Sequence, residues 1–343
     1  MSKAPISKTP NVPIIGGGPA GMSCALWLDN YGLAPIIIEQ APELGGMARA
    51  SPYPNEWLLG RPGETARQNA AAFARHVRQA KVECRLGARP QRVTQRPDGG
   101  FELEVAFADH RAPQSLSCPA VVIAAGTRFR GQDFIDTVAN ARELAQRGRL
   151  HLGPTWAREP GADLPGADLP GADLPGADLG SHVAVIGGGD NAFDVSRMLV
   201  EKGVKATIVM RSQSPHAQPL LVERLRAHQA SGMADVMAGQ TVTALDEAGA
   251  KIRVGISDGH AIDVDHVVLL FGYQPNADDP WLQGLALERG TEGHLVVDGN
   301  METSCRGVFA VGDIANPMHP CIATAIGTGT MAAREIQRRL SAR

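Results

Sequence analysis

The same glycine-rich motif occurs twice in this chain, each time between an apolar run and a segment of helical pattern. The first copy is Gly-Gly-Gly-Pro-Ala-Gly at 16–21, and the second is Gly-Gly-Gly-Asp-Asn-Ala at 187–192. Such a turn between a buried strand and a helix is typical of dinucleotide sites, because free N–H groups and the helix dipole face the pyrophosphate. The two copies predict an α/β fold with two Rossmann-like dinucleotide-binding domains in a three-layer ββα arrangement.

In the first copy each glycine has its own task. Gly16 permits a tight turn, Gly18 lets the backbone approach a pyrophosphate, and Gly21 lets the helix pack against the strand. Glu39 closes the next apolar run, where a carboxylate accepts hydrogen bonds from ribose hydroxyls. The residues expected in this first site are Gly16, Gly18, Pro19, Ala20, Gly21 and Glu39.

The second copy differs at the end of its following strand. The run 206–210 ends in Met210 without an acid, and Arg211 and Ser212 come next. A carboxylate there repels a 2′-phosphate, whereas an arginine and a hydroxyl bind one, so the pattern favours NADP(H) over NAD(H). The alternative is that Arg211 is a solvated loop cation. The residues expected in this second site are Gly187, Gly189, Asp190, Asn191, Ala192, Arg211 and Ser212.

Further motifs lie in order along the chain: Gly45-Gly46, Ala-Ala-Gly-Thr at 124–127, and Gly-Val-Phe-Ala-Val-Gly-Asp at 307–313. Together with the glycine motifs they resemble the thioredoxin reductase-like flavoproteins, which include thioredoxin reductases and ferredoxin–NADP reductases of that type. The resemblance covers nearly the whole chain. It implies FAD in the first site, NADPH in the second with NADH as an alternative, and a homodimer.

The resemblance also implies roles at the flavin. Asp313 would bind the ribityl chain, and the Ile322 backbone N–H would face flavin O2, where the helix dipole stabilises negative charge. Cys321 would lie beside the flavin, as a packing residue or as a thiol in contact with it; no residue is assigned as catalytic. The further FAD-site residues implied are Gln40, Gly46, Met47, Ala125, Gly126, Gly312, Asp313, Cys321, Ile322 and Ala323.

The domain plan follows from the same resemblance. A discontinuous FAD domain, 1–128 and 270–343, would enclose an inserted NAD(P)H domain at 129–269. Before the second glycine motif, Pro-Gly-Ala-Asp-Leu occurs four times without variation. Proline and glycine in every copy exclude a helix or a central strand, so 160–180 is predicted to be a linker or loop.

One family feature is missing. Thioredoxin reductases carry a C-x-x-C dithiol shortly before the second glycine motif, where this chain has no cysteine between 150 and 156. Without two thiols no internal dithiol can relay electrons. We expect an FAD-dependent NAD(P)H oxidoreductase that passes electrons to an external acceptor such as ferredoxin, flavodoxin, a quinone or a small molecule. Two alternatives stay open: a sensory flavoprotein with a vestigial nicotinamide site, and a reductase that works with a partner's thiols.

Composition and charge argue against several other classes of protein. The net charge of −3 and the pI of about 6.4 do not indicate a nucleic-acid partner. No run of eighteen apolar residues predicts a membrane span, and no His, Cys, Asp or Glu spacing predicts a metal site. Five dispersed cysteines and a polar start without an apolar signal segment favour a cytoplasmic location. These cysteines are Cys24, Cys84, Cys118, Cys305 and Cys321.

Overall fold

The chain forms two compact units in the computed structural model, which describes residues 10–51, 54–97, 99–154 and 179–342. Unit 1 runs to Arg128 and resumes at Gln274, and unit 2 runs from Phe129 to Tyr273. The junction expected at 269/270 lies at the end of a strand, and the chain leaves unit 2 only after Tyr273. The predicted repeat linker lies outside the described residues up to its last two positions.

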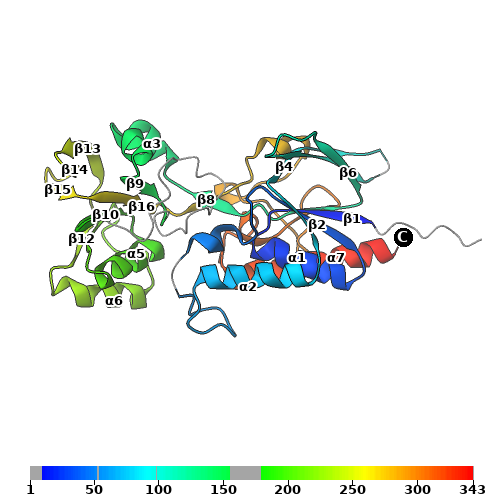
Figure 1. The fold of residues 1–343 in the computed structure, drawn as a ribbon, viewed down its shortest axis with the longest axis horizontal. Helices are drawn as coiled ribbons and strands as arrows, with labels where there is room; N and C mark the ends of the chain where they lie inside the picture. Colours follow the sequence, from blue (N-terminus) through cyan, green and yellow to red (C-terminus); the bar gives the residue numbers. More distant parts are fainter. Residues whose placement is uncertain (1–9, 52–53, 98, 155–178, 343) are drawn as a thin grey trace, which may run out of the picture. The chain divides into compact units, whose positions relative to one another are not determined.

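Unit 1 is built on a parallel sheet with strand order β18-β7-β1-β2-β3. Its strands are β1 (Asn11–Ile15), β2 (Ala34–Glu39), β3 (Glu83–Leu86), β7 (Val121–Ile123) and β18 (Val308–Ala310). The helices on one face are α1 (Pro19–Asn30), α2 (Ala66–Gln79) and α7 (Ile322–Ser341) (Figure 1). The antiparallel sheet on the other face is β4 (Ala88–Gln95), β5 (Phe101–Phe107) and β6 (Gln114–Cys118).

The middle strand β2 shows why the sequence needs an unbroken apolar run here. Ile36 and Ile38 pack into the core shared with β4 to β6, while Ile37 packs into the core beneath the helices. Side chains alternate between the faces of a strand, and both faces of this sheet are covered. A continuous Ile-Ile-Ile segment therefore fills two separate cores, which confirms the buried parallel strand expected from the sequence.

The last helix lies against the first. A side chain at Gly329 of α7 would place its Cβ 2.3 Å from the Ala20 carbonyl oxygen of α1, so the two backbones pack in close contact. The Ser23 hydroxyl donates to the Ile326 carbonyl at 2.8 Å. This contact brings the C-terminal motif to the first glycine turn, although about three hundred residues separate them in sequence.

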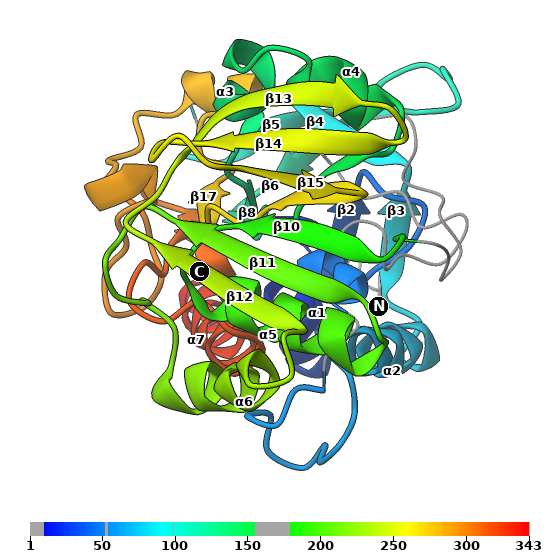
Figure 2. The same cartoon turned by 90° about the vertical axis from the view of Figure 1, so that its left-hand side faces the viewer.

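Unit 2 repeats the plan with parallel strand order β12-β11-β10-β16-β9. These strands are β9 (Leu150–Leu152), β10 (His182–Ile186), β11 (Lys205–Met210), β12 (Ala234–Ala238) and β16 (His266–Leu269). Figure 2 shows β12, β11 and β10 side by side. Helices α5 (Asp190–Glu201) and α6 (Pro219–Gln229) lie on one side. The other side carries β13 (Val242–Ala248), β14 (Lys251–Ile256), β15 (Ala261–Val264), α3 (Gln132–Thr137) and α4 (Ala141–Gln146).

Short elements complete the chain. Two strands pair where the chain passes between the units, β8 (Thr127–Phe129) and β17 (Tyr273–Pro275). The 3₁₀ turns are η1 (Gly46–Ala50), η3 (Pro280–Gly284), η4 (Thr291–Gly293) and η5 (Gly312–Ile314). The sequence pattern predicts a helix from Met22, whereas α1 begins at Pro19, because proline is well suited to the first helical position. It likewise predicts a last helix from Thr324, whereas α7 begins at Ile322, because Cys321 caps it. The predicted α/β fold with two parallel-sheet units is confirmed.

Candidate functional site

The first glycine turn joins β1 to α1 and has no room for a side chain at Gly16 or Gly21. Gly16 has a φ of +113°, and a Cβ there would lie 2.2 Å from the Ala124 carbonyl oxygen. A Cβ at Gly21 would lie 2.0 Å from the Gly16 carbonyl oxygen. The Gly16 N–H is bonded to Ile38 at 2.9 Å, which closes the turn onto β2. The turn leaves the first N–H groups of α1 open to an anion.

Glu39 is buried beside this turn at the end of β2. Its carboxylate accepts the Gly17 N–H at 2.7 Å and the Ala41 N–H at 2.8 Å. Burial raises the pKa of the Glu39 carboxyl, and the N–H groups of Ala41 and Gly17 act in the opposite direction. Each oxygen keeps a further lone pair, so the carboxylate can hold the turn and still accept a ribose hydroxyl.

A second pair of glycines lies against the turn. The Gly45 N–H donates to the Gly17 carbonyl at 2.8 Å, and a Cβ at Gly46 would lie 3.0 Å from the Gly18 Cα. Gly46 has a φ of +57° and starts η1, which contains Met47. The sequence-predicted Gly18, Gly46 and Met47 are thus brought together, whereas Gln40 follows β2 with an exposed side chain.

The strand β7 adds the next side of the site. The Ala125 amide lies 3.2 Å from the position of a Cβ on Gly16, so Ala125 and Gly126 border the turn. Asn276 holds them in place: its side-chain amide donates to the Ala125 carbonyl at 2.7 Å and its backbone N–H to Gly126 at 3.0 Å. Sequence reasoning missed Asn276, because nothing local ties it to a segment some 150 residues earlier.

Asp313 enters the site from the end of β18. Gly312 has a φ of +73°, a Cβ there would lie 2.8 Å from the Ala20 Cβ, and its N–H donates to the Thr328 hydroxyl at 2.9 Å. The Asp313 Oδ1 atom is buried without a hydrogen-bond partner. Burial raises the pKa of Asp313 to about 6. A carboxylate held this way calls for a hydroxyl donor, and a ribityl chain supplies one.

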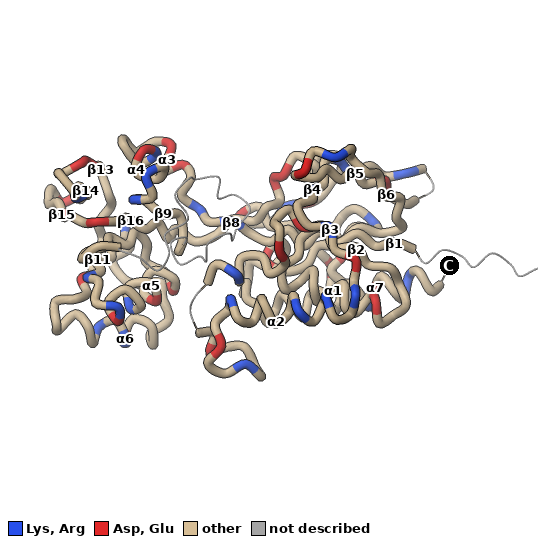
Figure 3. The backbone as a smooth tube through the Cα atoms, in the orientation of Figure 1, with Lys and Arg blue, Asp and Glu red and all other residues tan. Residues whose placement is uncertain are grey.

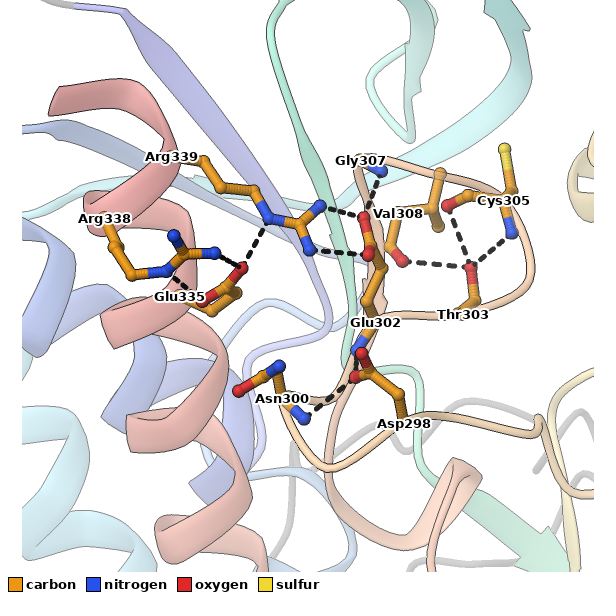
Figure 4. A network of polar contacts seen from close by, with 10 residues as sticks. All are labelled: Asp298, Asn300, Glu302, Thr303, Cys305, Gly307, Val308, Glu335, Arg338 and Arg339. Atoms are coloured by element: carbon orange, nitrogen blue, oxygen red, sulfur yellow. Dashed lines mark hydrogen bonds and ion pairs between the residues drawn. The ribbon is translucent and has the colours of Figure 1, made fainter. Parts of the chain in front are cut away.

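A charged network holds the turn before β18, the strand that precedes Asp313 (Figure 4). Glu302 accepts the Gly307 N–H at 2.7 Å and an Arg339 N–H at 2.6 Å, and Arg339 also donates to Glu335 at 2.5 Å. The side-chain bonds from Arg338 and then Arg339 lower the pKa of Glu335 to about 2. The end of α7 is therefore tied to the turn that precedes β18.

Cys321 caps α7, and Ile322 is its first residue. The Cys321 sulfur accepts the Thr324 N–H at 3.5 Å, and the Thr324 hydroxyl accepts the Cys321 N–H at 3.3 Å. The cap leaves the N–H groups of Ile322 and Ala323 without a capping bond at the positive end of a 20-residue helix. This end of the site therefore offers backbone N–H donors in the field of the helix dipole. It does not offer a pair of thiols.

These residues together fit a flavin dinucleotide. The turn at Gly16–Gly21 and the N-terminus of α1 suit a diphosphate, Glu39 suits a ribose, and the orphaned Asp313 oxygen suits a polyol hydroxyl. All of them belong to unit 1. The predicted first site is therefore a single contiguous arrangement, with Asn276 as an addition.

The second glycine turn lies in unit 2 between β10 and α5. Gly187 has a φ of +149°, a Cβ there would lie 2.3 Å from the Leu270 carbonyl oxygen, and its N–H is bonded to Val209 at 3.0 Å. Ala192 is buried and donates to the Gly189 carbonyl at 3.0 Å. The Asn191 side-chain amide donates to the Tyr273 hydroxyl at 3.1 Å. This turn also leaves helix N–H groups for a diphosphate.

The loop after β11 folds back over this turn. The Ser212 hydroxyl is 3.4 Å and the Met210 sulfur 3.2 Å from the position of a Cβ on Gly188. The His216 N–H donates to the Gly188 carbonyl at 2.8 Å, which sequence reasoning did not foresee. Arg211 is exposed beside Ser212 and has no ion-pair partner among the described residues. The Ser212 hydroxyl thus lies against the turn, and Arg211 is the exposed residue that precedes it in the chain.

Asp190 brings an acid to this turn, and the loop holds it. Its carboxylate accepts the Gln218 backbone N–H at 2.7 Å and the Gln218 side-chain amide at 3.1 Å. Both carboxylate oxygens are thereby engaged in hydrogen bonds. Gln218 is a second residue of this loop that sequence reasoning missed.

No dithiol lies near either turn. All five cysteines are free and belong to unit 1, and the sequence of unit 2 contains none. Burial raises the pKa of Cys118 to about 12 and raises that of Cys24 as well, which keeps both as thiols. At the position of the missing dithiol, the Gly153 backbone packs on the Phe129 ring, 2.4 Å from where a Cβ would be.

The described residues form neither a metal site nor a membrane-spanning helix. Three or more His, Cys, Asp or Glu side chains that could hold a metal do not gather there. Among the described helices, none is long and apolar enough to cross a membrane. Acidic and basic residues are mixed along both units (Figure 3).

Comparisons with known proteins place these features in context. A sequence model of the pyridine nucleotide-disulphide oxidoreductases matches residues 10–335. A ferredoxin–NADP reductase of Limosilactobacillus fermentum is 28% identical over 341 residues, which is 96% of this chain and 94% of that protein. One from Ignicoccus hospitalis is 27% identical over 303 residues, which is 88% of each chain.

Solved structures show the same fold. The thioredoxin reductase of T. acidophilum superposes with a TM-score of 0.78 at 22% identity, covering 98% of this chain and 100% of that one. The thioredoxin reductase of Lactococcus lactis superposes with a TM-score of 0.79 at 20% identity, with the same coverage.

Proposed function

This chain belongs to the pyridine nucleotide-disulphide oxidoreductase family and is an FAD-dependent NAD(P)H oxidoreductase, and from this premise we propose that it oxidises NADPH and delivers the electrons to an acceptor outside the chain. Relatives named ferredoxin–NADP reductases make ferredoxin- or flavodoxin-type proteins the first acceptors to test. A quinone or a small molecule is the next class.

The distribution of cysteines carries the external-acceptor part of the proposal. A dithiol relay requires two thiols close together, and unit 2, which holds the second glycine turn, has no cysteine at all. The sequence contains no C-x-x-C motif elsewhere, and the five cysteines are free. Electrons that reach the flavin therefore leave the chain without passing through an internal disulfide.

Unit 1 supplies the flavin site. Bound FAD would supply the redox chemistry, accepting hydride from the nicotinamide and giving up electrons afterwards. The Gly16–Gly21 turn and α1 hold the diphosphate, Glu39 accepts from the ribose, and Asp313 accepts from the ribityl chain. The Ile322 N–H and the α7 dipole stabilise negative charge at the pyrimidine end.

Unit 2 supplies the nicotinamide nucleotide site. The Gly187–Ala192 turn and α5 hold the diphosphate, while Gln218 keeps the Asp190 carboxylate occupied. Arg211 and the Ser212 hydroxyl bind the 2′-phosphate, because an unpaired guanidinium and a hydroxyl attract a dianion. The site therefore prefers NADPH, with NADH as a weaker substrate.

Anaerobic mixing of the holoenzyme with each nicotinamide tests the proposal. NADPH should bleach the flavin band rapidly and NADH more slowly, and a reduced sample should then be reoxidised by ferredoxin or flavodoxin. A flavin that neither nicotinamide reduces would favour the alternative of a sensory flavoprotein. Loss of turnover after alkylation of the five cysteines would instead indicate a thiol step.

The homodimer implied by the family resemblance remains a proposal. Light scattering coupled to gel filtration measures it directly, since one chain has a mass of 36.2 kDa. A mass near that of a single chain at working concentration would contradict the homodimer.

A further inference from the structure

The guanidinium group of Arg49 is buried, and one of its nitrogen atoms has no hydrogen-bond acceptor. Its side chain is 9% exposed, and its NH2 atom pairs at 3.2 Å with Glu43, whose own side chain is 60% exposed. Its NH1 atom is buried and has no hydrogen-bond partner. A buried N–H donor of a cation is costly to leave unpaired, so its presence indicates that something else binds there.

Asn69 of α2 is the second polar residue of this region without partners. It is fully buried, and both its Oδ1 and its Nδ2 atoms lack a partner. An asparagine amide can donate two hydrogen bonds and accept two, so an isolated one is rarely left in a core. Arg49 and Asn69 are thus two independent signs of a missing polar ligand.

Both residues belong to segments that meet at Gly45. The Cγ and Cδ atoms of Arg49 are 2.5 and 2.7 Å from the position of a Cβ on Gly45, and Ala70, the neighbour of Asn69, is 3.1 Å from that point. The Arg67 guanidinium donates to the Arg49 carbonyl at 3.0 Å, which ties η1 to α2. The stem of Arg49 is therefore held against Gly45.

Gly45 connects this region to the first glycine turn. Its N–H donates to the Gly17 carbonyl at 2.8 Å, and the Gly17 N–H donates in turn to Glu39 at 2.7 Å. The charge of Arg49 acts on Glu39 across this short distance. The orphaned cation consequently lies at the end of unit 1 where the nucleotide half of a bound FAD would lie.

We propose that Arg49, supported by Asn69, is a binding residue for the adenosine diphosphate half of FAD. The inference rests on the FAD site proposed above and assigns it a cation that neither the glycine motif nor the family resemblance supplies. The diphosphate carries the formal negative charge of FAD, and the helix N-terminus offers only dipoles to it. The Arg49 NH1 group donates to a diphosphate oxygen, and the Asn69 amide completes the polar shell.

The first test measures FAD release from the holoenzyme. Diluted protein is followed by the rise in fluorescence as FAD leaves the site. Arg49→Gln should weaken FAD binding by roughly 10- to 100-fold, as expected for one charge-assisted hydrogen bond pair. Arg49→Lys should lie between, because it keeps the charge and loses the planar fork. Arg75→Gln on the exposed side of α2 is the matched control and should behave as wild type.

The second test separates binding from folding by the sign of its effect. Without FAD, Asn69→Leu should unfold at the wild-type temperature or above it, because it removes a buried amide without partners. Arg49→Gln should lose little stability, because it gives up only the pair with the exposed Glu43. The upward shift in Tm that ADP produces should shrink in both variants. The shift produced by riboflavin, which lacks the diphosphate, should stay the same.

Two results would overturn the inference. One is FAD release from Arg49→Gln at the wild-type rate; the other is an apoprotein that loses stability while its ADP shift is intact, which would make Arg49 a purely structural residue. Failure of NADPH to reduce the wild-type flavin would contradict the proposed function and leave these FAD measurements unaffected.

Discussion

The two glycine turns have the same backbone geometry. They differ in the residue that ends the following strand. In each, the first glycine has a positive φ and donates its N–H to the following strand, from Gly16 to Ile38 and from Gly187 to Val209. In each, the second of the three consecutive glycines, Gly17 or Gly188, lies next to the last residue of that strand. That residue is the buried acid Glu39 in unit 1 and the apolar Met210 in unit 2.

The difference shows which part of a nucleotide site is general and which is selective. Backbone N–H groups and a helix dipole bind any diphosphate, so they recur in both units. In the two proposed sites the strand end would meet the ribose, where Glu39 suits free hydroxyls and where Ser212 and Arg211 suit a phosphate. Four substitutions or pH changes test this comparison, from the largest expected effect to the smallest.

Substitutions at the last position of the glycine motif, Gly21 in unit 1 and Ala192 in unit 2, should differ most in their effect on stability. In Gly21→Ala the new Cβ would lie 2.0 Å from a backbone oxygen, so we expect a loss of about 3 kcal/mol or more and of most bound FAD. Ala192→Gly removes a Cβ that unit 2 accommodates and should cost about 0.5–1 kcal/mol. Thermal unfolding and flavin content per chain measure both, and equal losses would show that the turns are not built as described.

Acid should destabilise unit 2 more than unit 1. His151 of β9 and His266 of β16 are buried with their ring nitrogens 3.1 Å apart, and burial and the neighbouring His266 lower the pKa of His151 to about 3. The unfolded chain, with a pKa near 6.5, binds the proton first, so this stability is complete above pH 6.5 and is lost as the pH falls. At pH 4 the loss is about 3 kcal/mol.

Hydrogen exchange at low pH reads the two units separately. The strands of unit 2 should lose protection between pH 6.5 and pH 4 before those of unit 1 do. In His151→Phe this pH dependence should flatten, while His76→Gln on the exposed side of α2 should leave it unchanged. Simultaneous loss of protection in both units would rule out the histidine pair as the cause.

The preference for NADPH over NADH tests the role of Arg211 beside the second turn. Arg211→Gln should lower kcat/KM for NADPH by roughly 10- to 100-fold, because it removes a charge-assisted contact to the 2′-phosphate. The value for NADH, which has no such phosphate, should change little. Steady-state rates with both nicotinamides give the answer, and an equal fall for the two would make Arg211 a structural residue.

The smallest effect is expected for the stability of the apoprotein, in which no ribityl hydroxyl partners the Asp313 carboxyl. Its folded pKa of about 6 lies above the ordinary value of 3.8, so its contribution to stability is complete below pH 3.8 and is lost as the pH rises to 6. A pKa of about 6 instead of 3.8 corresponds to at most about 3 kcal/mol, and because Asp313 as a whole is only half-buried we expect Asp313→Asn apoprotein to be about 1–2 kcal/mol more stable than wild type at pH 7 and close to it at pH 4. Urea unfolding at both pH values measures this, and a difference independent of pH would exclude the carboxyl as its source.

Much of the architecture could be predicted from local patterns. Apolar runs such as 35–39 and 182–186, each next to a glycine turn, predicted the parallel strands, and Pro19 gave a signal for the start of α1 that the prediction placed three residues late. Glu39 and Ser212 were placed at the turns by spacing alone, and both lie there. These signals are local because strand burial and turn geometry depend on neighbours in sequence.

Other site features have no local signal. Asn276 reaches Ala125, Gly329 packs on Ala20, and His151 meets His266 only after the sheets have formed. Arg49 and Asn69 look like ordinary residues of a loop and a helix in the sequence. Their isolation as buried polar groups is a property of the packed unit, since burial and hydrogen-bond partners are set by segments far apart in the chain.

By itself the sequence determined that this chain has two dinucleotide turns, an acid at one and an arginine at the other, and no dithiol between them. Those facts follow from residue type and spacing, which fix backbone conformation and charge locally. Only the tertiary structure decided which polar groups are left without partners and which helix lies on which turn. Such properties depend on how sheet order brings distant segments together, and they add Asn276, Asp313 and Arg49 to the residues of the proposed FAD site.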